Sequence, residues 1–193
     1  MLFPALQDVK HALSETSVSQ QVHVSVQAIL PAAFGFAFPA SSSFTLLLQS
    51  NQGIWSTKGT TASSSALHRL SYNEDGDKQV AVIEIAITSS TAQAVANYLS
   101  ASGLSYRQHI RYDLPGGPDH INGVADAVQA LTIAQQIGKD LRVLCGQGIS
   151  QIHLFAAIPA ALAVMIGHHF NALCPIFLYE YAHGSYQPAC VLG

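Results

Sequence analysis

Apolar residues along the chain fall into short runs that predict strands alternating with helices. The clearest strand is QVAVIEIAIT (79–88), which is apolar at most positions. The next segment, SSTAQAVANYLSASG (89–103), predicts a helix that Ser89, Ser90 or Thr91 caps and that a glycine ends. A buried strand followed directly by a capped helix is typical of α/β proteins.

The same alternation continues toward the C-terminus. YRQHIRYDL (106–114) predicts a strand, and GVADAVQALTIAQQIGKDL (123–141) predicts an amphipathic helix. The segment PIFLYEYAHGSYQPACVLG (175–193) predicts two strands joined by a turn at His183-Gly184. The apolar face of the helix at 123–141 consists of Val124, Val128, Leu131 and Ile137.

The stretch IHLFAAIPAALAVMIGHHF (152–170) is long and nearly uncharged, so a membrane span has to be considered. It is shorter than the roughly 18–20 uninterrupted apolar residues that a span requires, because Pro159 interrupts it. Proline is tolerated at the first position of a helix, so we interpret IHLFAAI as a strand and PAALAVMIGHHF as a helix. Both are apolar on most sides, which favours a central parallel strand and the helix that covers it.

The first third of the chain is less regular. QVHVSVQAIL (21–30) and FTLLLQS (44–50) predict strands, PAAFGFAFPASSS (31–43) is ambiguous, and NQGIWSTKGTTASSS (51–65) predicts a polar loop carrying the only tryptophan. Strand–helix units repeat across 79–182. We therefore expect an α/β fold with a largely parallel central sheet flanked by helices.

Composition adds a constraint on partners. The chain has 193 residues, enough for one domain or two small fused subdomains, and only 10% are charged, against a usual fraction of about 25%. So few charges favour a subunit of an oligomer, or a domain of a longer protein. The net charge is −3 and no basic stripe is present, which argues against binding duplex nucleic acid but leaves a small anionic ligand open.

The cysteines and the first residues bear on the compartment. Cys145, Cys174 and Cys190 are far apart and form no CxxC pair, so we expect buried free thiols in a reducing cytoplasm. Pro4 and Asp8 interrupt any apolar run that would serve as a secretory signal.

Two predicted strand ends offer a ligand site. AITSST (86–91) combines hydroxyls with the free N–H groups of a helix start, and FAAIPAA (155–161) has side chains small enough for a ligand to approach the backbone. Ligands of open α/β sheets bind beyond the carboxyl ends of the strands, and helix N-termini attract anions. Two such ends would hold two or more phosphates. The alternative is ordinary N-capping and tight packing.

Other side chains have both a chemical and a structural interpretation. Trp55, beside Ser56 and Lys58, either stacks on a nucleobase or fills the core. Arg107, His109 and Arg111 alternate along one predicted strand and form either a basic face or a solvated one. For Tyr179 and Tyr181, cross-strand core pairing is favoured over ligand stacking. The residues with both a chemical and a structural interpretation are Trp55, Ser56, Lys58, Arg107, His109, Arg111, Tyr179 and Tyr181.

The sequence contains none of the common catalytic motifs: there is no GxSxG, HExxH, P-loop or GxGxxG. His168 and His169 are adjacent and point to different helix faces, so they cannot chelate a metal as an i, i+4 pair would. Asp113, Asp119 and His120 would supply an acid and a base, but no nucleophile accompanies them. We expect no catalytic residue, no metal and no cofactor.

Three segments, taken in order, resemble the SAVED family. SQIHLFAAIPAALAVMIGHHFNALCPIFLYEY (150–181) is similar to its C-terminal signature, a strand of type hLF-A-hP, a helix opening with small residues and a strand ending in aromatics. VAVIEIAITSSTAQAVANYL (80–99) resembles the family's central strand and helix, and DHINGVADAVQALTIAQQI (119–137) the helix that follows. GIWSTKG (53–59) fits a tryptophan-bearing loop of the family less specifically.

The resemblance implies one sensor domain over 1–193, built from two fused CARF-like, Rossmann-like halves of about 1–78 and 79–193. SAVED domains bind cyclic oligonucleotide second messengers in bacterial anti-phage defence, mainly in CBASS and in some type III CRISPR systems. They are usually fused to an effector, which this chain would lack. An HNH–SAVED endonuclease is one such architecture, in which ligand binding drives oligomerisation and DNA cleavage.

The resemblance also implies a set of ligand contacts. The loop at 88–90 and the loop at 157–159 would face phosphates, and the residues at 55–58 would hold a base and a phosphate. The scarcity of basic residues favours a cyclic di- or trinucleotide over a larger ring. The residues placed at the ligand are Trp55, Ser56, Lys58, Thr88, Ser89, Ser90, Arg107, Phe155, Ala157, Pro159 and Tyr181.

Two alternatives to a sensor remain open. One is a ring nuclease that degrades the messenger, using Asp113, His120 or a 2′-hydroxyl held for in-line attack. The other is an interaction domain without a ligand, in which FAAIPAA is merely packed core.

Overall fold

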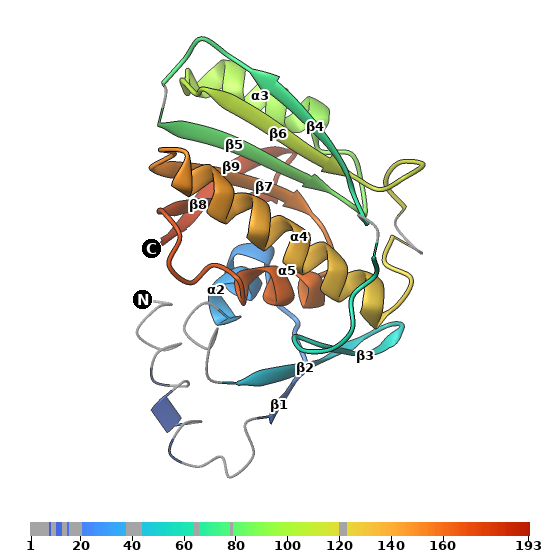
Figure 1. Cartoon of the computed structure of the whole chain (residues 1–193). Helices are drawn as coiled ribbons and strands as arrows, with labels where there is room; N and C mark the ends of the chain where they lie inside the picture. The colour runs from blue at the N-terminus through green and yellow to red at the C-terminus, as the bar shows by residue number, and fades with distance from the viewer. Residues whose placement is uncertain are drawn as a thin grey trace. The chain divides into compact units, whose positions relative to one another are not determined.

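The computed structural model describes residues 8, 11–12, 15, 21–37, 44–63, 66–77, 79–119 and 123–193 (Figure 1). The chain divides into two compact units whose segments interleave along the sequence. The single sensor domain with halves of about 1–78 and 79–193, which the resemblance implies, stays a prediction. Unit 1 comprises Met1–Ser65, Val124–Gly138 and Ala160–Asn171; unit 2 comprises Ala66–Gly123, Lys139–Pro159 and Ala172–Gly193.

Unit 1 contains a three-stranded sheet in the order β1-β2-β3. β1 is parallel to β2, and β3 is antiparallel to it. The prediction of a polar loop over 51–65 is wrong for its first part, where β3 forms. The segment at 31–43, which the sequence left ambiguous, contains most of a helix, α2. The elements are β1 (Gln21–Val24), α2 (Leu30–Ala37), β2 (Thr45–Ser50), β3 (Gly53–Ser56) and α5 (Ala160–Gly167).

The core of unit 1 is packed around α5. Every residue of α5 from Ala161 to Gly167 is buried, as its uniformly apolar sequence predicts. The ring of Phe34 in α2 stacks on that of Phe170, with centroids 5.6 Å apart. A Cβ at Gly167 would overlap the backbone of Phe34, so only glycine permits this approach of α5 to α2.

Unit 2 contains a six-stranded sheet in the order β4-β6-β5-β7-β8-β9. The four inner strands run parallel to one another, and the edge strands β4 and β9 are each antiparallel to the strand beside them. The predicted largely parallel α/β sheet is confirmed, with antiparallel edges that make it mixed. The strands are β4 (His68–Asn73), β5 (Val80–Ala86), β6 (Gln108–Asp113), β7 (Gln151–Ala157), β8 (Ile176–Ala182) and β9 (Ser185–Leu192).

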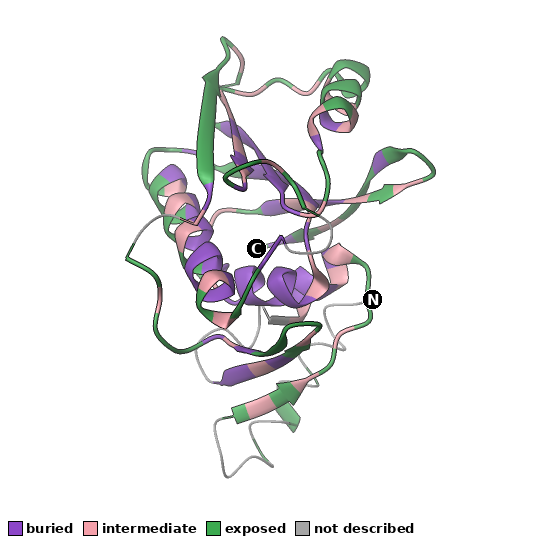
Figure 2. Ribbon diagram, turned by 90° about the vertical axis from the view of Figure 1, so that its right-hand side faces the viewer, coloured by how far each residue is buried: buried purple, intermediate pink, exposed green. Residues whose placement is uncertain are grey.

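Helices lie on both faces of this sheet. α3 (Ala92–Ser102) places Val95 in a buried cluster with Val82 and Phe155. On the opposite face, Tyr112 donates a hydrogen bond to Asp140 of α4 (Ala127–Gly146), with 2.8 Å between the two oxygens. The two central strands, β5 and β7, are accordingly buried along most of their length, and Figure 2 shows buried residues in purple.

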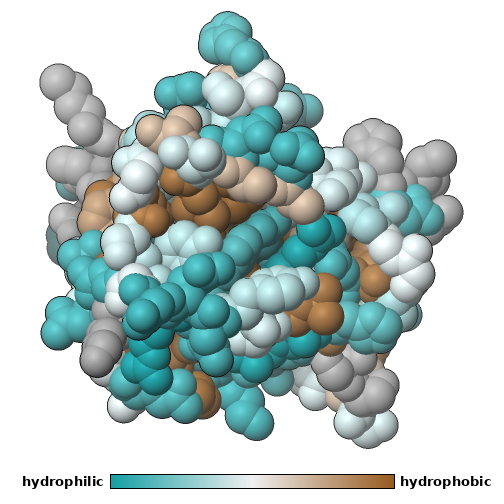
Figure 3. All heavy atoms as spheres, turned by 90° about the horizontal axis from the view of Figure 1, so that it is seen from above, coloured by the Kyte–Doolittle hydropathy of each residue, from teal (hydrophilic) through white to brown (hydrophobic). Residues whose placement is uncertain are grey.

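Two expectations about apolar surface need correction. Val128, predicted on the buried face of its helix, is 42% exposed, because the buried face of α4 runs through Ala130 and Ile137 and Val128 lies on the opposite side of the helix. Edge strand β4, which the sequence did not reveal, is exposed at every residue, and Leu70 and Tyr72 leave about half of their surface open. Figure 3 shows apolar atoms gathered in small, separate areas among hydrophilic ones. Scattered apolar residues of this kind are normal on a protein surface.

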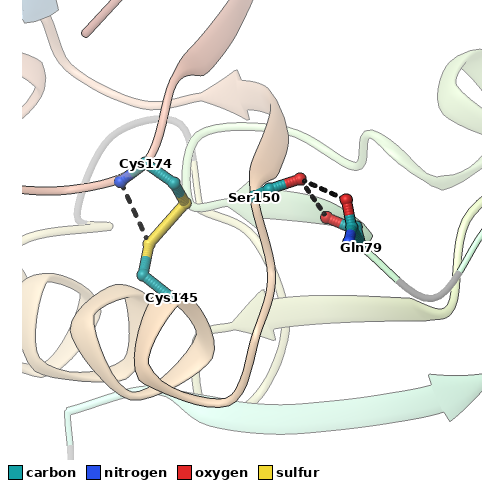
Figure 4. The surroundings of a disulfide bond; sticks show 4 residues. All are labelled: Gln79, Cys145, Ser150 and Cys174. Carbon is teal, nitrogen blue, oxygen red and sulfur yellow. Dashed lines mark hydrogen bonds between the residues drawn. A yellow bond between two sulfur atoms is a disulfide. The ribbon is translucent and has the colours of Figure 1, made fainter.

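The cysteines differ from expectation. Cys145, at the end of α4, and Cys174, just before β8, form a disulfide with their Cα atoms 5.9 Å apart (Figure 4). The expected free thiols are therefore wrong for this pair, and Cys190 alone stays a free thiol among the described cysteines. Nothing in the spacing could have indicated the bond, since 29 positions separate the partners and only the fold brings them together.

Candidate ligand-binding site

The ends of β5 and β7 lie side by side at the carboxyl edge of the parallel strands. Ala86 pairs with Ala157 in the β5–β7 register. The carbonyl oxygen of Ala157 then accepts hydrogen bonds from the N–H groups of Ile87 and Thr88, each at 2.9 Å. The structure thus brings the two predicted strand ends together. Ser89 and Ser90, which follow Thr88, are exposed.

Thr91 anchors the other end of this segment. Its side chain is 2% exposed, and its hydroxyl donates a hydrogen bond of 2.7 Å to Oε2 of Glu84. Thr91 is the N-cap residue of α3, but its side chain makes no capping hydrogen bond to the helix. Within the described part of the chain, the N–H groups at 92–94 have no hydrogen-bond acceptor. The helix start therefore keeps the donors that attract anions.

Glu84 is a carboxylate buried in the middle of the central strand. It is 2% exposed, and its second oxygen, Oε1, is hydrogen-bonded to Nε2 of His109 on β6. Burial by itself raises the pKa of Glu84, but the hydrogen bonds from His109 and Thr91 and the charges of His109 and Arg111 lower it below its usual value. The group is thus held as a charged carboxylate.

Sequence reasoning missed Glu84. It stands alone among apolar residues in VAVIEIA, and that isolation is the one signal the sequence offers. A buried carboxylate is retained only with compensating partners, and these come from a different strand and from a loop.

The predicted basic face on β6 is not an open one. His109 and Arg111 share a face of the strand, but His109 binds Glu84, and Nε of Arg111 lies 2.8 Å from Oδ2 of Asp113. Arg107 precedes the strand and is exposed. Of the three, Arg107 alone stays a candidate contact for a phosphate.

The candidate rings at 55 and 155 are buried. Phe155 is 0% exposed and stacks on Tyr179 with centroids 4.1 Å apart, and Trp55 is 1% exposed on β3. Neither presents a ring face to a ligand in this structure, so their predicted contacts require a rearrangement. Trp55, Ser56 and Lys58 belong to unit 1, whereas the other candidates belong to unit 2. Lys58 is exposed, and its N–H donates to the hydroxyl of Ser56 at 3.1 Å.

Three tyrosines lie on β8 and at the start of β9. Tyr179 is buried in the core, as the preferred interpretation had it, while Tyr181 is 57% exposed and meets Tyr186 edge to face at 5.2 Å. Tyr186 in turn donates a hydrogen bond of 3.3 Å to the carbonyl of Ala156. Tyr181 is thus an accessible aromatic ring linked through Tyr186 to the end of β7. Pro159 follows β7 and is half-buried.

Asp113 and Asp119, two of the residues considered for catalysis, each have a partner in the described part of the chain. Asp113 is paired with Arg111, and the N–H of Asp119 donates to the carbonyl of Ile87 at 2.9 Å. His120 lies outside the described residues. Across the described ranges no group of three or more His, Cys, Asp or Glu side chains is placed to hold a metal, and no helix is long and apolar enough to cross a membrane.

This fold and this edge define a class: an α/β domain whose parallel strands end at exposed backbone and hydroxyl donors, where such sheets bind their ligands. The chain belongs to the SAVED family, described as the SMODS-associated and fused to various effectors sensor domain, whose profile matches residues 5–192. The family resemblance is confirmed.

Curated relatives match over part of this chain. A CD-NTase-associated protein 4 of Moraxella osloensis is 32% identical over 74 residues, which are 37% of this chain and 16% of the relative. One from an Acinetobacter species is 39% identical over 45 residues, 23% of this chain and 10% of the relative. The alignments thus span less than a fifth of each relative.

Solved structures match over nearly the whole chain. The Cap4 SAVED/CARF-domain receptor of Acinetobacter baumannii with the cyclic trinucleotide 3′3′3′-cAAA superposes with a TM-score of 0.81 at 15% identity, over 96% of this chain and 42% of that one. The Moraxella osloensis Cap4 receptor gives 0.73 at 16% identity, over 99% and 41%. At this identity the likeness shows the fold, which is the SAVED/CARF one, and the chain spans less than half of each receptor.

Proposed function

We propose that this chain is a sensor domain that binds a cyclic di- or trinucleotide second messenger in bacterial anti-phage signalling. The observation that carries the proposal is the segment at 87–91, which is anchored at both ends and presents Ser89, Ser90 and the open start of α3 at the carboxyl edge of the sheet. Backbone N–H groups and hydroxyls of this kind bind phosphates without basic side chains.

Family membership and the relatives support the choice of ligand. The family is one of sensor domains, and two structures of the Acinetobacter baumannii receptor carry the cyclic trinucleotides 3′3′3′-cAAA and 2′3′3′-cAAA. We extend this ligand class to the present chain. The exposed Tyr181 is the ring best placed to stack on a base, because Phe155 and Trp55 are buried.

The proposal includes a larger assembly. The chain covers under half of each matched receptor, which supports a protein in which this domain is joined to an effector, such as a nuclease. Ligand binding would favour the assembled, active state by the difference in ligand affinity between the two states. The sensor itself would need no cofactor and perform no reaction. Its place in the cytoplasm follows from the proposed signalling role alone, because the Cys145–Cys174 disulfide removes the argument from free thiols.

Binding to a panel of cyclic nucleotides tests this function. Isothermal titration of the chain with cyclic di- and trinucleotides, including both cAAA isomers, is expected to give saturable binding to at least one, with light scattering reporting any association. Absence of binding across the panel at millimolar concentration would contradict the proposal. Loss of intact messenger during incubation would favour the ring nuclease instead.

A charge placed in the loop tests the location. Ser89→Asp is expected to weaken binding about tenfold or more, because a carboxylate beside the helix start repels phosphate and competes for its N–H groups. Ala96→Glu, on the exposed surface of α3, adds the same charge outside the loop and should leave affinity within about twofold. Equal effects of the two changes would remove the site from this loop.

A further inference from the structure

Glu84 needs an explanation that packing does not give. A carboxylate in the middle of the central strand loses its hydration, and an apolar residue would fill the same position in a sheet buried on both faces. Two partners offset the loss, and the hydroxyl of Thr91 and the ring of His109 occupy one oxygen each. Both carboxylate oxygens of Glu84 are therefore occupied, one by the loop that contains Thr91 and one by the neighbouring strand β6.

The contact with Thr91 reaches the start of α3. A threonine at an N-cap ordinarily turns its side-chain oxygen toward the N–H groups of the first helical turn. Here the hydroxyl instead points to Glu84, and no capping bond from this side chain is present. The carboxylate therefore has two effects: it fixes Thr91, and it leaves the donors at 92–94 for another acceptor.

The second anchor of the loop is independent of Glu84. Ile87 and Thr88 are held by the carbonyl of Ala157 on β7. Between this backbone anchor and Thr91 stand the exposed residues Ser89 and Ser90. If Thr91 were released, the loop would be anchored at one end only. The ligand would then have to order the loop on binding, which costs affinity.

We propose that Glu84, acting through the hydroxyl of Thr91, is a positioning residue for ligand recognition: it holds the 87–91 loop in its binding form and keeps the N-terminus of α3 uncapped. This rests on the proposed function for the choice of ligand. The anchoring itself concerns the protein alone and is measured without a ligand.

The test compares Thr91→Val, which keeps the shape of the side chain and removes the hydroxyl, with Thr91→Ser, which keeps the hydroxyl. Amide hydrogen exchange is measured first in the ligand-free protein at Val95, whose N–H donates a hydrogen bond of 2.9 Å to the carbonyl of Thr91 and is therefore exposed when Thr91 is released. Titration with 3′3′3′-cAAA follows, or with the panel member that the wild type binds best. Thr91→Val is expected to accelerate exchange and to weaken binding by about tenfold each, since a hydrogen bond to a buried charge is lost. Thr91→Ser should stay within about twofold of the wild type in both.

A second variant separates positioning from general stability. The hydroxyl of Thr132 is also buried and bridges the carbonyl of Val128 and the N–H of Ala62, at 2.7 and 2.8 Å. Thr132→Val removes both hydrogen bonds of this hydroxyl, which lies in unit 1. It is expected to lower the melting temperature while leaving exchange at Val95 and ligand affinity unchanged.

Each outcome bears on the proposal. Unchanged exchange in Thr91→Val, equal losses in Thr91→Ser, or faster exchange with unchanged affinity would each overturn the positioning role. If the wild type binds no member of the panel, the proposed function fails, and the role of Glu84 in ligand recognition fails as well. In that case a difference in exchange between Thr91→Val and Thr91→Ser still supports the anchoring of the loop by Glu84.

Discussion

Two strand–helix–strand segments of this protein are stabilised by different chemistry. In β5–α3–β6, the loop before the helix is tied down by polar side chains, Glu84, Thr91 and His109. In β7–α5–β8, the helix is buried along its length, and the chain that follows it is tied by the disulfide of Cys174 with Cys145. Hydrogen bonds of side chains can be switched by protonation or by a competing ligand, whereas close packing and a covalent bond cannot. The recognition role that we propose therefore falls on the segment whose contacts can be altered, and the second segment provides rigidity.

The disulfide gives the largest expected effect. In the chain-entropy account, closing a loop of 29 positions stabilises the folded state by about 3 to 4 kcal/mol. Reduction with dithiothreitol, or the change Cys145→Ser, is expected to lower the free energy of unfolding in urea by that amount. The Cys145→Ser protein should show no further loss on reduction, and Cys190→Ser should still respond like the wild type. A reductant without effect on the wild type would show that this bond contributes nothing to stability.

Packing around α5 gives the next effect. Gly167→Ala is expected to destabilise the protein by about 2 kcal/mol, because the new methyl overlaps the backbone of Phe34, which cannot move aside as a flexible side chain would. Gly146→Ala is the matched control, since a Cβ there meets no atom within 4 Å. Equal stability of the two variants by urea denaturation would contradict the close approach of α5 and α2.

The same contrast explains how much of the fold the sequence predicts. β5, β7, α3 and α5 follow from the apolar pattern, because each is buried along a face or throughout. Strand β4 leaves no such pattern, since HRLSYN is exposed at every residue and is recognisable as a strand only by its pairing with β6. Strand β3 was hidden in the same way inside a polar stretch.

The candidate site was predictable to the level of strand ends. Parallel strands place their carboxyl ends at one edge, so the proximity of the loops at 88 and 157 follows from the order of elements. The link from Glu84 to Thr91 and His109 depends on the register of β5 against β6 and on the path of the loop. Neither can be derived from one sequence, and both partners of the disulfide were missed for the same reason.

Acid provides the smallest and most discriminating test of the comparison. The carboxyl of Glu84 has a lowered pKa in the folded protein, so the charged form is favoured by folding. Its contribution is fully present at neutral pH, above the pKa of an unfolded carboxyl, and is lost as the pH falls through the folded value. The groups that face Glu84 are His109 and Arg111 from β6, Thr91 before α3, and the tyrosines Tyr106 and Tyr186. Burial raises the pKa of both tyrosines, and neighbouring negative charge, including that of Glu84, raises it further.

Glu84→Gln keeps the size of the side chain and removes the charge, so its stability deficit relative to the wild type should shrink between about pH 7 and about pH 3. The deficit of Gly167→Ala, which arises from overlap of atoms, should stay constant over the same range. Urea denaturation of the three proteins at four pH values measures both. Parallel curves for the wild type and Glu84→Gln would mean that the carboxylate charge does not stabilise the loop, and the contrast between a titratable segment and a rigid one would fail.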